Sequence, residues 1–251
     1  MLIASLLSLT TPAPLRLRRL GYVRESSLLQ ARSRRCRRAW APHLARARKT
    51  VAEAALACPD RRLAVVLGSG LLDDVPLDIL ARTFDRVRLV DAVHPWPARL
   101  AMRRHRHVER VTAEISAGLC EPAFGQAVEG ASLIVSANVL SQLAILPVDA
   151  FGRAGREAPP ALSVTIVEAH LAALSALARR GARVCLITDT VQREEDREGR
   201  ILSTGDLLAG VTLPPPDSAW DWELAPFGEA GRDRRTVHRV QAYPAWGGDR
   251  L

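Results

Sequence analysis

The stretch "AVVLGSGLLDDVP", Ala64–Pro76, decides how the rest of the chain is interpreted. A short apolar run, rich in valine, ends in Gly-Ser-Gly at 68–70, and two aspartates and a proline follow. Apolar runs of this length are typical of a parallel strand that is buried on both faces. Glycines at the end of such a strand allow a ligand to approach the backbone closely, because they carry no Cβ. The stretch therefore predicts a strand, a ligand-binding loop and a helix, in that order.

The composition describes a globular chain with an excess of positive charge. Its 251 residues, 48% of them hydrophobic and 25% charged, suit one sizeable α/β domain with an appendage. A net charge of +8 favours an anionic partner such as nucleic acid. Lys49 is the only lysine, so the preference for arginine indicates a compositional bias of the source, and the charge carries less weight.

Cysteine usage and the apolar segments indicate a cellular compartment. Four cysteines are far apart and form no Cys-x-x-Cys pair, which argues against a zinc site or a disulfide framework: Cys36, Cys58, Cys120 and Cys185. The apolar N-terminus is followed, not preceded, by arginines, which is the reverse of a signal peptide. No apolar run approaches the ~20 residues of a membrane-spanning helix. We expect a cytoplasmic protein without a membrane partner.

Residues 1–60 form a basic segment that differs from the rest of the chain. Between positions 16 and 49 there are twelve basic residues and one acidic residue. Apolar residues recur at helical spacing and predict two helices, broken near Pro42 and closed by Pro59. The run "RSRRCRR" at 32–38 is either a solvated or acid-paired face or a contact surface for RNA or another anion.

From residue 61 to residue 251, strands and helices alternate. Strands are expected at 62–68, 86–91, 108–115, within 131–143 and at 182–190, and helices at 73–84, 95–105 and 160–181. The runs at 220–228 and 234–246 have no long helical pattern between them and predict an antiparallel hairpin at the sheet edge. The fold class is therefore α/β, a Rossmann-like doubly wound and mostly parallel sheet preceded by a helical segment.

Three predicted strand ends carry residues suited to a nucleoside. Open α/β sheets bind ligands at the carboxyl ends of their strands, near the point where strand order reverses. An acid that ends the second strand, 21 residues after the second glycine, can accept both hydroxyls of a ribose. An acid and an apolar neighbour after the third strand can hold the edge and face of an adenine. The predicted cofactor contacts are Gly68, Ser69, Gly70, Asp91, Ala92, Glu114, Ile115 and Ser136.

Two cofactors fit a glycine loop with an acid at this spacing, a nicotinamide dinucleotide and S-adenosylmethionine. In the dinucleotide fingerprint Gly-x-Gly-x-x-Gly/Ala, Asp73 would replace the last small residue. Asp73 and Asp74 would then crowd the helix N-terminus that receives a pyrophosphate, at about 1 kcal/mol or more per close pair of like charges. S-adenosylmethionine has no phosphate and carries an ammonium and a sulfonium, so it suits these carboxylates better.

Residues 60–245 resemble a class I S-adenosylmethionine-dependent methyltransferase. The resemblance lies in the Gly-x-Gly loop, the acids after strands two and three, and the terminal hairpin. It implies a seven-stranded sheet whose last strand is antiparallel. It also implies that Gly68 and Gly70 line the methionine part, Asp91 the ribose, and Glu114 with Ile115 the adenine. Val66 stands where the family often has an acid, and Leu72 stands where its fuller motif has a third glycine.

The segment "SANVLSQL", residues 136–143, would face the substrate in such an enzyme. Asn138 is the candidate catalytic residue, because an amide there can position an amine or hydroxyl nucleophile; a helix cap is the structural alternative. His94 and Ser141 are further candidates for substrate contact. Methyl transfer mainly needs alignment of the nucleophile with the sulfonium, so no metal is expected.

The sequence leaves more than one function open. The leading hypothesis is methyl transfer from S-adenosylmethionine to an unidentified small molecule or RNA. A non-catalytic member of the same fold, binding a nucleoside or a protein, is an alternative that Val66 and Leu72 favour. An NAD(P)-dependent oxidoreductase is a further alternative, which Asp73 disfavours.

Overall fold

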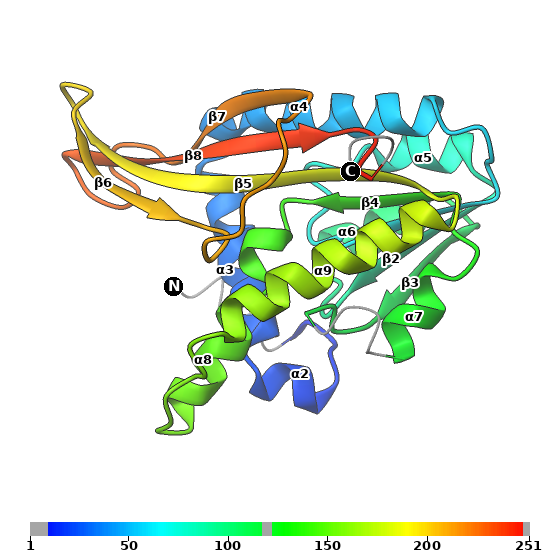
Figure 1. Ribbon diagram of the computed structural model, residues 1–251, viewed down its shortest axis with the longest axis horizontal. Helices are drawn as coiled ribbons and strands as arrows, with labels where there is room; N and C mark the ends of the chain where they lie inside the picture. The colour runs from blue at the N-terminus through cyan, green and yellow to red at the C-terminus, as the bar shows by residue number, and fades with distance from the viewer. Residues whose placement is uncertain (1–9, 117–121, 248–251) are drawn as a thin grey trace.

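The structure is a computed structural model, and it describes residues 10–116 and 122–247. One sheet crosses the molecule, with helices on both faces (Figure 1). Its main path is β3-β2-β1-β4-β5-β8-β7, and β6 pairs with β5 outside that path. The strands are β1 (Leu63–Leu67), β2 (Arg86–Asp91), β3 (Val108–Thr112), β4 (Leu133–Ala137), β5 (Arg183–Asp196), β6 (Ile201–Asp206), β7 (Ser218–Ala225) and β8 (Arg234–Tyr243). The predicted Rossmann-like α/β fold is confirmed.

Strands β1 to β5 form the parallel half of the sheet. β1 pairs with β2 on one side and with β4 on the other, so strand order reverses at β1. Every residue of β1 and of β4 is buried, which explains why both segments are apolar without alternation. The carboxyl ends of β1 and β4 therefore flank the switch point at which open α/β sheets bind ligands.

The C-terminal strands form the antiparallel half. β8 lies between β5 and β7 and runs antiparallel to both, with β7 at the edge. The predicted terminal hairpin and its antiparallel last strand are confirmed. The seven strands of the main path agree with the sheet that the resemblance implied.

The sequence did not predict β6. β5 continues as far as Asp196, beyond its expected end at Thr190. The additional residues pair antiparallel with β6. β6 is exposed at almost every position. A strand without a buried face has no alternation of apolar residues, so no pattern in the sequence could reveal it.

Two groups of helices cover the sheet. The helices α4 (Arg37–Leu56), α5 (Leu77–Thr83) and α6 (Trp96–Met102) share one core cluster on the first face. The helices α7 (Pro122–Val128) and α9 (Leu162–Arg179) belong to the cluster on the opposite face. Among the residues that the structure describes, further helices are α2 (Leu15–Arg19), α3 (Tyr22–Arg35), η2 (Leu140–Gln142, a 3-10 turn) and α8 (Ile145–Arg153).

The break between the N-terminal helices lies at Cys36, so its predicted position near Pro42 is wrong. Pro42 lies inside α4. A proline in a helix interior removes one hydrogen bond and costs about 3 kcal/mol. Burial of Trp40, Ala47 and Val51 along the same helix offsets that cost. The helix ends at Leu56, before Pro59 as expected.

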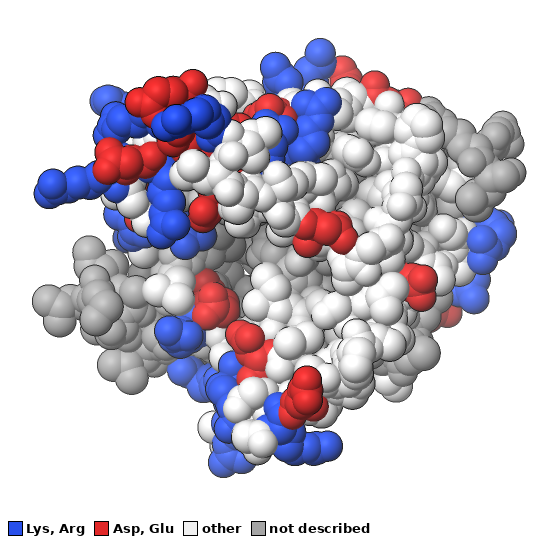
Figure 2. All heavy atoms as spheres, turned by 60° about the vertical axis from the view of Figure 1, so that its left-hand side comes forward, with Lys and Arg blue, Asp and Glu red and all other residues white. Residues whose placement is uncertain are grey.

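The arginine run at 32–38 is partly paired with an acid. The Arg35 guanidinium lies 2.5 Å from the Glu229 carboxylate, and Arg32 lies 3.7 Å from the same group. Glu229 belongs to the connector between β7 and β8. Figure 2 likewise shows basic side chains lying among acidic ones at the upper left of the view. Arg34, Arg37 and Arg38 are exposed.

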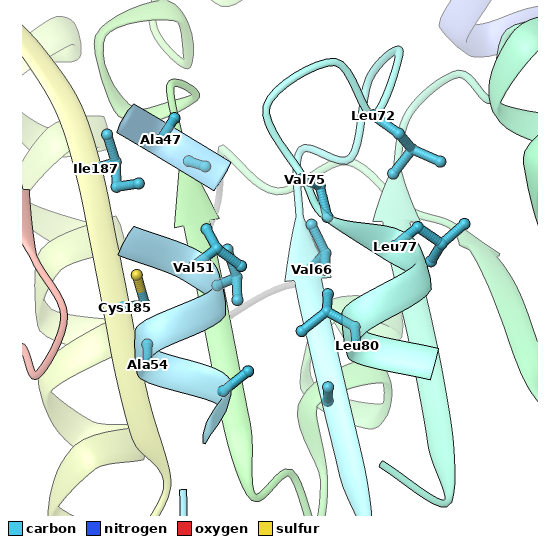
Figure 3. Packing of buried hydrophobic residues seen from close by; sticks show 14 of the residues in the cluster. Ala47, Val51, Ala54, Val66, Leu72, Val75, Leu77, Leu80, Cys185 and Ile187 are labelled. Carbon is cyan, nitrogen blue, oxygen red and sulfur yellow. The ribbon is translucent and has the colours of Figure 1, made fainter. Parts of the chain in front are cut away.

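The helix α4 completes the core on its face of the sheet. Figure 3 shows Ala47, Val51 and Ala54 on the side of α4 that faces Cys185 and Ile187 of β5. Small side chains at these positions let the helix approach the strands closely. The N-terminal segment therefore shares its core with the sheet along α4.

By length and composition, α9 could cross a membrane, and it is the one helix of that kind within residues 10–116 and 122–247. Ile166, Val167 and Leu174 of this helix are buried in the cluster that covers the sheet. This packing accounts for its apolar composition as a core helix.

Removal of the Trp40 side chain tests whether α4 is integral to the domain. Trp40 is 3% exposed, its indole N–H donates to the Leu224 carbonyl at 2.9 Å, and its ring meets Trp222 edge-on. We expect Trp40→Ala to lower the free energy of unfolding by about 3–5 kcal/mol in a urea titration. Leu56→Ala, at an exposed position of the same helix, should change it by less than about 0.5 kcal/mol. Equal effects of the two substitutions would show that α4 does not pack as described.

Candidate functional site

The loop after β1 is held against its neighbours by backbone contacts. The N–H groups of Gly68 and Ser69 both donate to the Val90 carbonyl, at 2.9 and 3.3 Å. Gly68 has φ +66°, and a Cβ at this position would lie 2.5 Å from a methyl carbon of Val139. Glycine is therefore required here by close packing against the loop after β4 as well as by backbone conformation.

Asp91 joins the loops that follow β1 and β2. The Gly70 N–H donates to Oδ2 of Asp91 at 2.7 Å, and the Val93 N–H donates to Oδ1 at 3.1 Å. Burial raises the pKa of the Asp91 carboxyl, and these N–H donors oppose the shift. Each oxygen keeps a further lone pair, so the carboxylate can still accept a bond from a ligand hydroxyl.

The loop keeps a glycine-like conformation where the resemblance expects a third glycine. Leu72 has φ +62° and is buried, with its N–H donating to the Ser69 carbonyl at 3.0 Å. A left-handed conformation costs a non-glycine residue about 1–2 kcal/mol. Burial of the leucine side chain offsets this cost, so the backbone path survives the change in sequence. Val66 points into the core near Leu80 (Figure 3).

The N-terminal segment reaches the predicted adenine side of the site. The Tyr22 hydroxyl of α3 donates to the Glu114 carboxylate at 2.9 Å, and the Ser116 N–H donates to the same oxygen at 2.8 Å. Burial, together with the charge of Glu114, raises the pKa of Tyr22. Further along α3, Ser33 donates to the Asp73 carboxylate at 2.5 Å. The helix α3 is thus bonded to the loops after both β1 and β3.

The remaining predicted cofactor contacts, Ala92, Ile115 and Ser136, are all buried. Ala92 and Ile115 are buried beside Asp91 and Glu114 in the chain. Ser136 is fully buried, and its hydroxyl bonds Nε2 of His170 at 2.9 Å inside the core. The structure therefore does not bring the Ser136 side chain to the other candidates.

His94 lies below the surface next to the Asp91 loop. Its Nε2 bonds the Val111 carbonyl at 3.1 Å, while Nδ1 is buried and has no hydrogen-bond partner among the described residues. Burial lowers the pKa of His94, which keeps the ring neutral and Nδ1 an acceptor. The side chain is 2% exposed, so it supports the loop from beneath.

Asn138 occupies the left-handed region, with φ +53°, directly after β4. Its Nδ2 donates to the Asp74 carboxylate at 2.6 Å and lies 3.2 Å from Nε2 of His43 on α4. The Trp220 indole N–H lies 3.1 Å from Nδ1 of His43. The structure thus brings together the loops after β1 and β4, helix α4 and strand β7.

These contacts determine which ring nitrogen of His43 carries the proton. Burial lowers the pKa of His43 to about 4, so the ring is neutral at pH 7. Because Trp220 donates to Nδ1, the ring proton must be on Nε2. The contact between Nε2 and Asn138 Nδ2 then pairs two donors, and it is not a hydrogen bond. Oδ1 of Asn138 is also buried without a partner among the described residues. One N–H donor and one carbonyl acceptor therefore lie buried here without a partner among the described residues.

Ser141 belongs to a second polar group next to the first. Its hydroxyl donates to Oδ1 of Asp189 on β5, and Nδ1 of His238 on β8 lies 2.6 Å from Oδ2 of Asp189. Trp222 separates the two histidines: it stacks on His43 with centroids 4.0 Å apart and meets His238 edge-on. A buried layer of aromatic and polar groups thus lies behind Asn138.

Sequence reasoning missed Tyr22, His43, Asp189 and His238. His43 lies between Trp40 and Ala47 at helical spacing, so a histidine within a buried apolar stripe was a readable signal. The pairing of Asp189 with His238, 49 residues later, depends on the register of β5 and β8. Tyr22 carried no signal, because nothing local indicates that its helix crosses to Glu114. No group of three or more potential metal ligands occurs in the described part of the chain.

Comparison with known proteins finds similarity in solved structures alone. No protein-family model and no curated protein sequence matches the chain. 1,6-didemethyltoxoflavin-N1-methyltransferase of Burkholderia thailandensis, solved with bound 1,6-didemethyltoxoflavin and S-adenosylhomocysteine, is 17% identical to this chain. The match has a TM-score of 0.44 and covers 92% of this chain and 90% of that chain. The N-methyltransferase NodS of Bradyrhizobium japonicum WM9 is 12% identical to this chain. The match has a TM-score of 0.38 and covers 77% of this chain and 84% of that chain. The 23S rRNA methyltransferase ErmE is 13% identical to this chain. The match has a TM-score of 0.32 and covers 80% of this chain and 70% of that chain.

The Asp74 carboxyl makes stability depend on pH. Burial raises its pKa to about 6, against the Asn138 N–H, which lowers it. A neutral carboxyl is favoured in the fold, so this contribution is fully present below about pH 4 and is lost as pH rises through 6. Two pKa units correspond to about 2.7 kcal/mol, and partial exposure reduces this to about 1–2 kcal/mol.

The free energy of unfolding of the wild type should therefore fall by about 1–2 kcal/mol between pH 4 and pH 7 because of Asp74. The Asp74→Asn variant should not show this fall. The measurement is urea unfolding of wild type and variant across that range. The lowered pKa of His43 acts in the opposite direction, but it is common to both proteins and cancels in the difference. Asp149→Asn, on the exposed surface of α8, is the matched control. If the difference in the free energy of unfolding between wild type and Asp74→Asn is the same at every pH, the prediction is contradicted.

Proposed function

We propose that the protein is an S-adenosylmethionine-dependent methyltransferase whose acceptor binds beside Asn138. The observation that carries this proposal is the position of Asp91. Its carboxylate stands at the carboxyl end of β2, tied to Gly70 of the glycine loop, where it can accept hydroxyls of a ribose. The sheet order supports the proposal, because strand order reverses between this loop and the loop after β4.

The charges at this edge of the sheet favour a cationic cofactor. Asp74 lies in the loop after β1, Asp91 ends the neighbouring strand β2, and Asp73 adds a third carboxylate. A pyrophosphate would meet like charges here, at about 1 kcal/mol or more per close pair. S-adenosylmethionine supplies a methyl group on a sulfonium and brings no phosphate. Gly70 has φ +46°, and a Cβ at this position would meet only the carbonyl oxygen of Gly68 in the same loop. This part of the backbone therefore has room for a ligand.

The acceptor would use the two polar atoms that remain at Asn138. A hydroxyl can accept the His43 Nε2–H on one lone pair and donate to Oδ1 of Asn138, which leaves its second lone pair directed at the methyl group; an amine, with a single lone pair, can only donate to Oδ1 and keeps that lone pair for attack. Alignment is the main protein contribution to methyl transfer, since the sulfonium is already a good leaving group. His43 and Asn138 act as positioning residues in this proposal, with Trp220 setting the histidine tautomer.

The acceptor class and the compartment are part of the proposal. The buried surroundings of His43 and Asn138 suit a small hydroxyl or amine compound better than a base within a duplex. The described cysteines, Cys36, Cys58 and Cys185, are free and buried, which suits a reducing cytoplasm.

Substitution of Asp91 tests the cofactor. Asp91→Ala removes an ionised acceptor from two ribose hydroxyls, and hydrogen bonds to charged groups contribute about 1.5–3 kcal/mol each. We expect the Kd for S-adenosylhomocysteine, measured by titration calorimetry, to rise at least tenfold. Because the same change breaks the tie to Gly70, Asp91→Asn serves as a second variant that keeps one acceptor oxygen.

The control is Asp149→Ala, which removes an exposed carboxylate from α8 and should leave the Kd within twofold of wild type. The thermal midpoint of each variant shows whether it is folded. If the wild type does not bind S-adenosylhomocysteine or S-adenosylmethionine at millimolar concentration, the proposed function is wrong. Mass spectrometry of small molecules that copurify with the protein gives an independent check.

A further inference from the structure

An arginine-lined cavity lies between α6 and β3, outside the group of residues described above. Its volume is about 450 Å³. It is lined by six chemistry-bearing side chains, Trp96, Arg99, Arg103, His105, Arg106 and Arg110, together with apolar residues. No carboxylate belongs to this lining.

The four guanidinium groups of this cavity have no acidic partner. None of Arg99, Arg103, Arg106 and Arg110 forms an ion pair within the described part of the chain, whereas arginines of β5 and β8 do. Arg193 lies 2.7 Å from Asp221, and Arg235 lies 2.8 Å from Glu195. Such a concentration of unpaired positive charge around a cavity attracts an anion.

The two acids near the cavity contact His105 of its lining and Arg88, not the four lining arginines. Asp78 lies 2.8 Å from Nε2 of His105, and Glu109, on the other face of β3, pairs with Arg88 at 3.3 Å. The Arg99 Nε–H donates to the His94 carbonyl at 2.9 Å, which holds this guanidinium in place. Burial and the nearby Arg110 lower the pKa of Arg99, as crowded like charges do. A bound anion would relieve that repulsion.

An exposed indole stands beside these arginines. Trp96 is 44% exposed, whereas Trp40, Trp220 and Trp222 are buried. The Arg99 guanidinium lies 5.5 Å from the centroid of the Trp96 ring, which fixes one face of the indole. A rigid, solvent-accessible aromatic next to cationic side chains is the arrangement by which proteins stack a nucleobase and hold its phosphate.

We propose that this cavity binds a nucleoside phosphate, with the base against Trp96 and the phosphate held by Arg103, Arg106 and Arg110. Planar guanidinium groups suit phosphate oxygens, because two parallel N–H bonds match their spacing. The ligand is either a free nucleotide or one unit of single-stranded RNA. The site shares no side chain with the Asp91 and Asn138 groups, and it stands independently of the methyltransferase proposal.

The test compares Arg103→Gln/Arg106→Gln with Arg179→Gln/Arg180→Gln. Both pairs are exposed and remove the same charge, but the second pair ends α9 on the opposite face of the sheet. AMP is titrated by calorimetry and a labelled single-stranded RNA octamer by fluorescence anisotropy, with S-adenosylhomocysteine in excess so that AMP cannot report on the cofactor site. We expect the first variant to bind both probes at least tenfold more weakly, and the second to stay within twofold.

Salt and base dependence complete the test. Each lost phosphate contact should lower the slope of log K against log salt by about 0.7 for single strands, so about 1.4 for the first double variant. Trp96→Ala should weaken the binding of AMP at least fivefold but leave the binding of ribose 5-phosphate unchanged. An octamer that binds far more tightly than AMP identifies RNA as the source of the nucleotide; equal affinities identify the free nucleotide.

Either source agrees with the proposal. It is overturned if the two double variants lose affinity equally, because the attraction is then a property of net charge. It is also overturned if Trp96→Ala leaves AMP binding unchanged, because the site then holds phosphate without a base. Thermal midpoints of all variants confirm that the fold is retained, and none of these measurements needs methyl transfer.

Discussion

The carboxylate of Asp91 is the constraint on which the candidate site depends. It accepts the N–H of Gly70 on one oxygen and the N–H of Val93 on the other, and so it joins the loops after β1 and β2. A buried carboxylate is costly unless donors surround it, and here backbone N–H groups supply them. The glycine loop thereby takes a fixed path at the switch point of the sheet, beside an acid that retains free lone pairs.

The N-terminal helices turn this edge of the sheet into an enclosed region. Tyr22 and Ser33 bind acids after β3 and β1, and His43 brings a neutral imidazole to Asn138. Trp220 then decides which imidazole nitrogen carries the proton. The chemistry at Asn138 is therefore set by a segment that precedes the sheet in sequence and by a strand near the end of the chain.

The positive charge of the chain is distributed in two ways. Arginines of the long β5 and β8 strands, and part of the run at 32–38, are neutralised by acids at 2.5–2.8 Å. The arginines between α6 and β3 are not, and they surround a cavity next to an exposed tryptophan. The α6 and β3 arginines thus bring charge without an acidic partner to the lining of a cavity, where a ligand can meet it.

The sequence by itself determined the α/β class, most strand positions and the terminal hairpin, because burial on one or both faces imposes apolar runs of characteristic period. The sequence also put Gly70 and Asp91 at the carboxyl ends of two expected strands, and the hydrogen bond between them emerged only in the structure. The tertiary structure alone decided the strand β6, the helix break at Cys36 and the burial of Ser136. It alone brought Tyr22, His43 and His238 to the loops. An exposed strand has no burial pattern, and contacts between residues far apart in sequence depend on packing, so neither leaves a local signal.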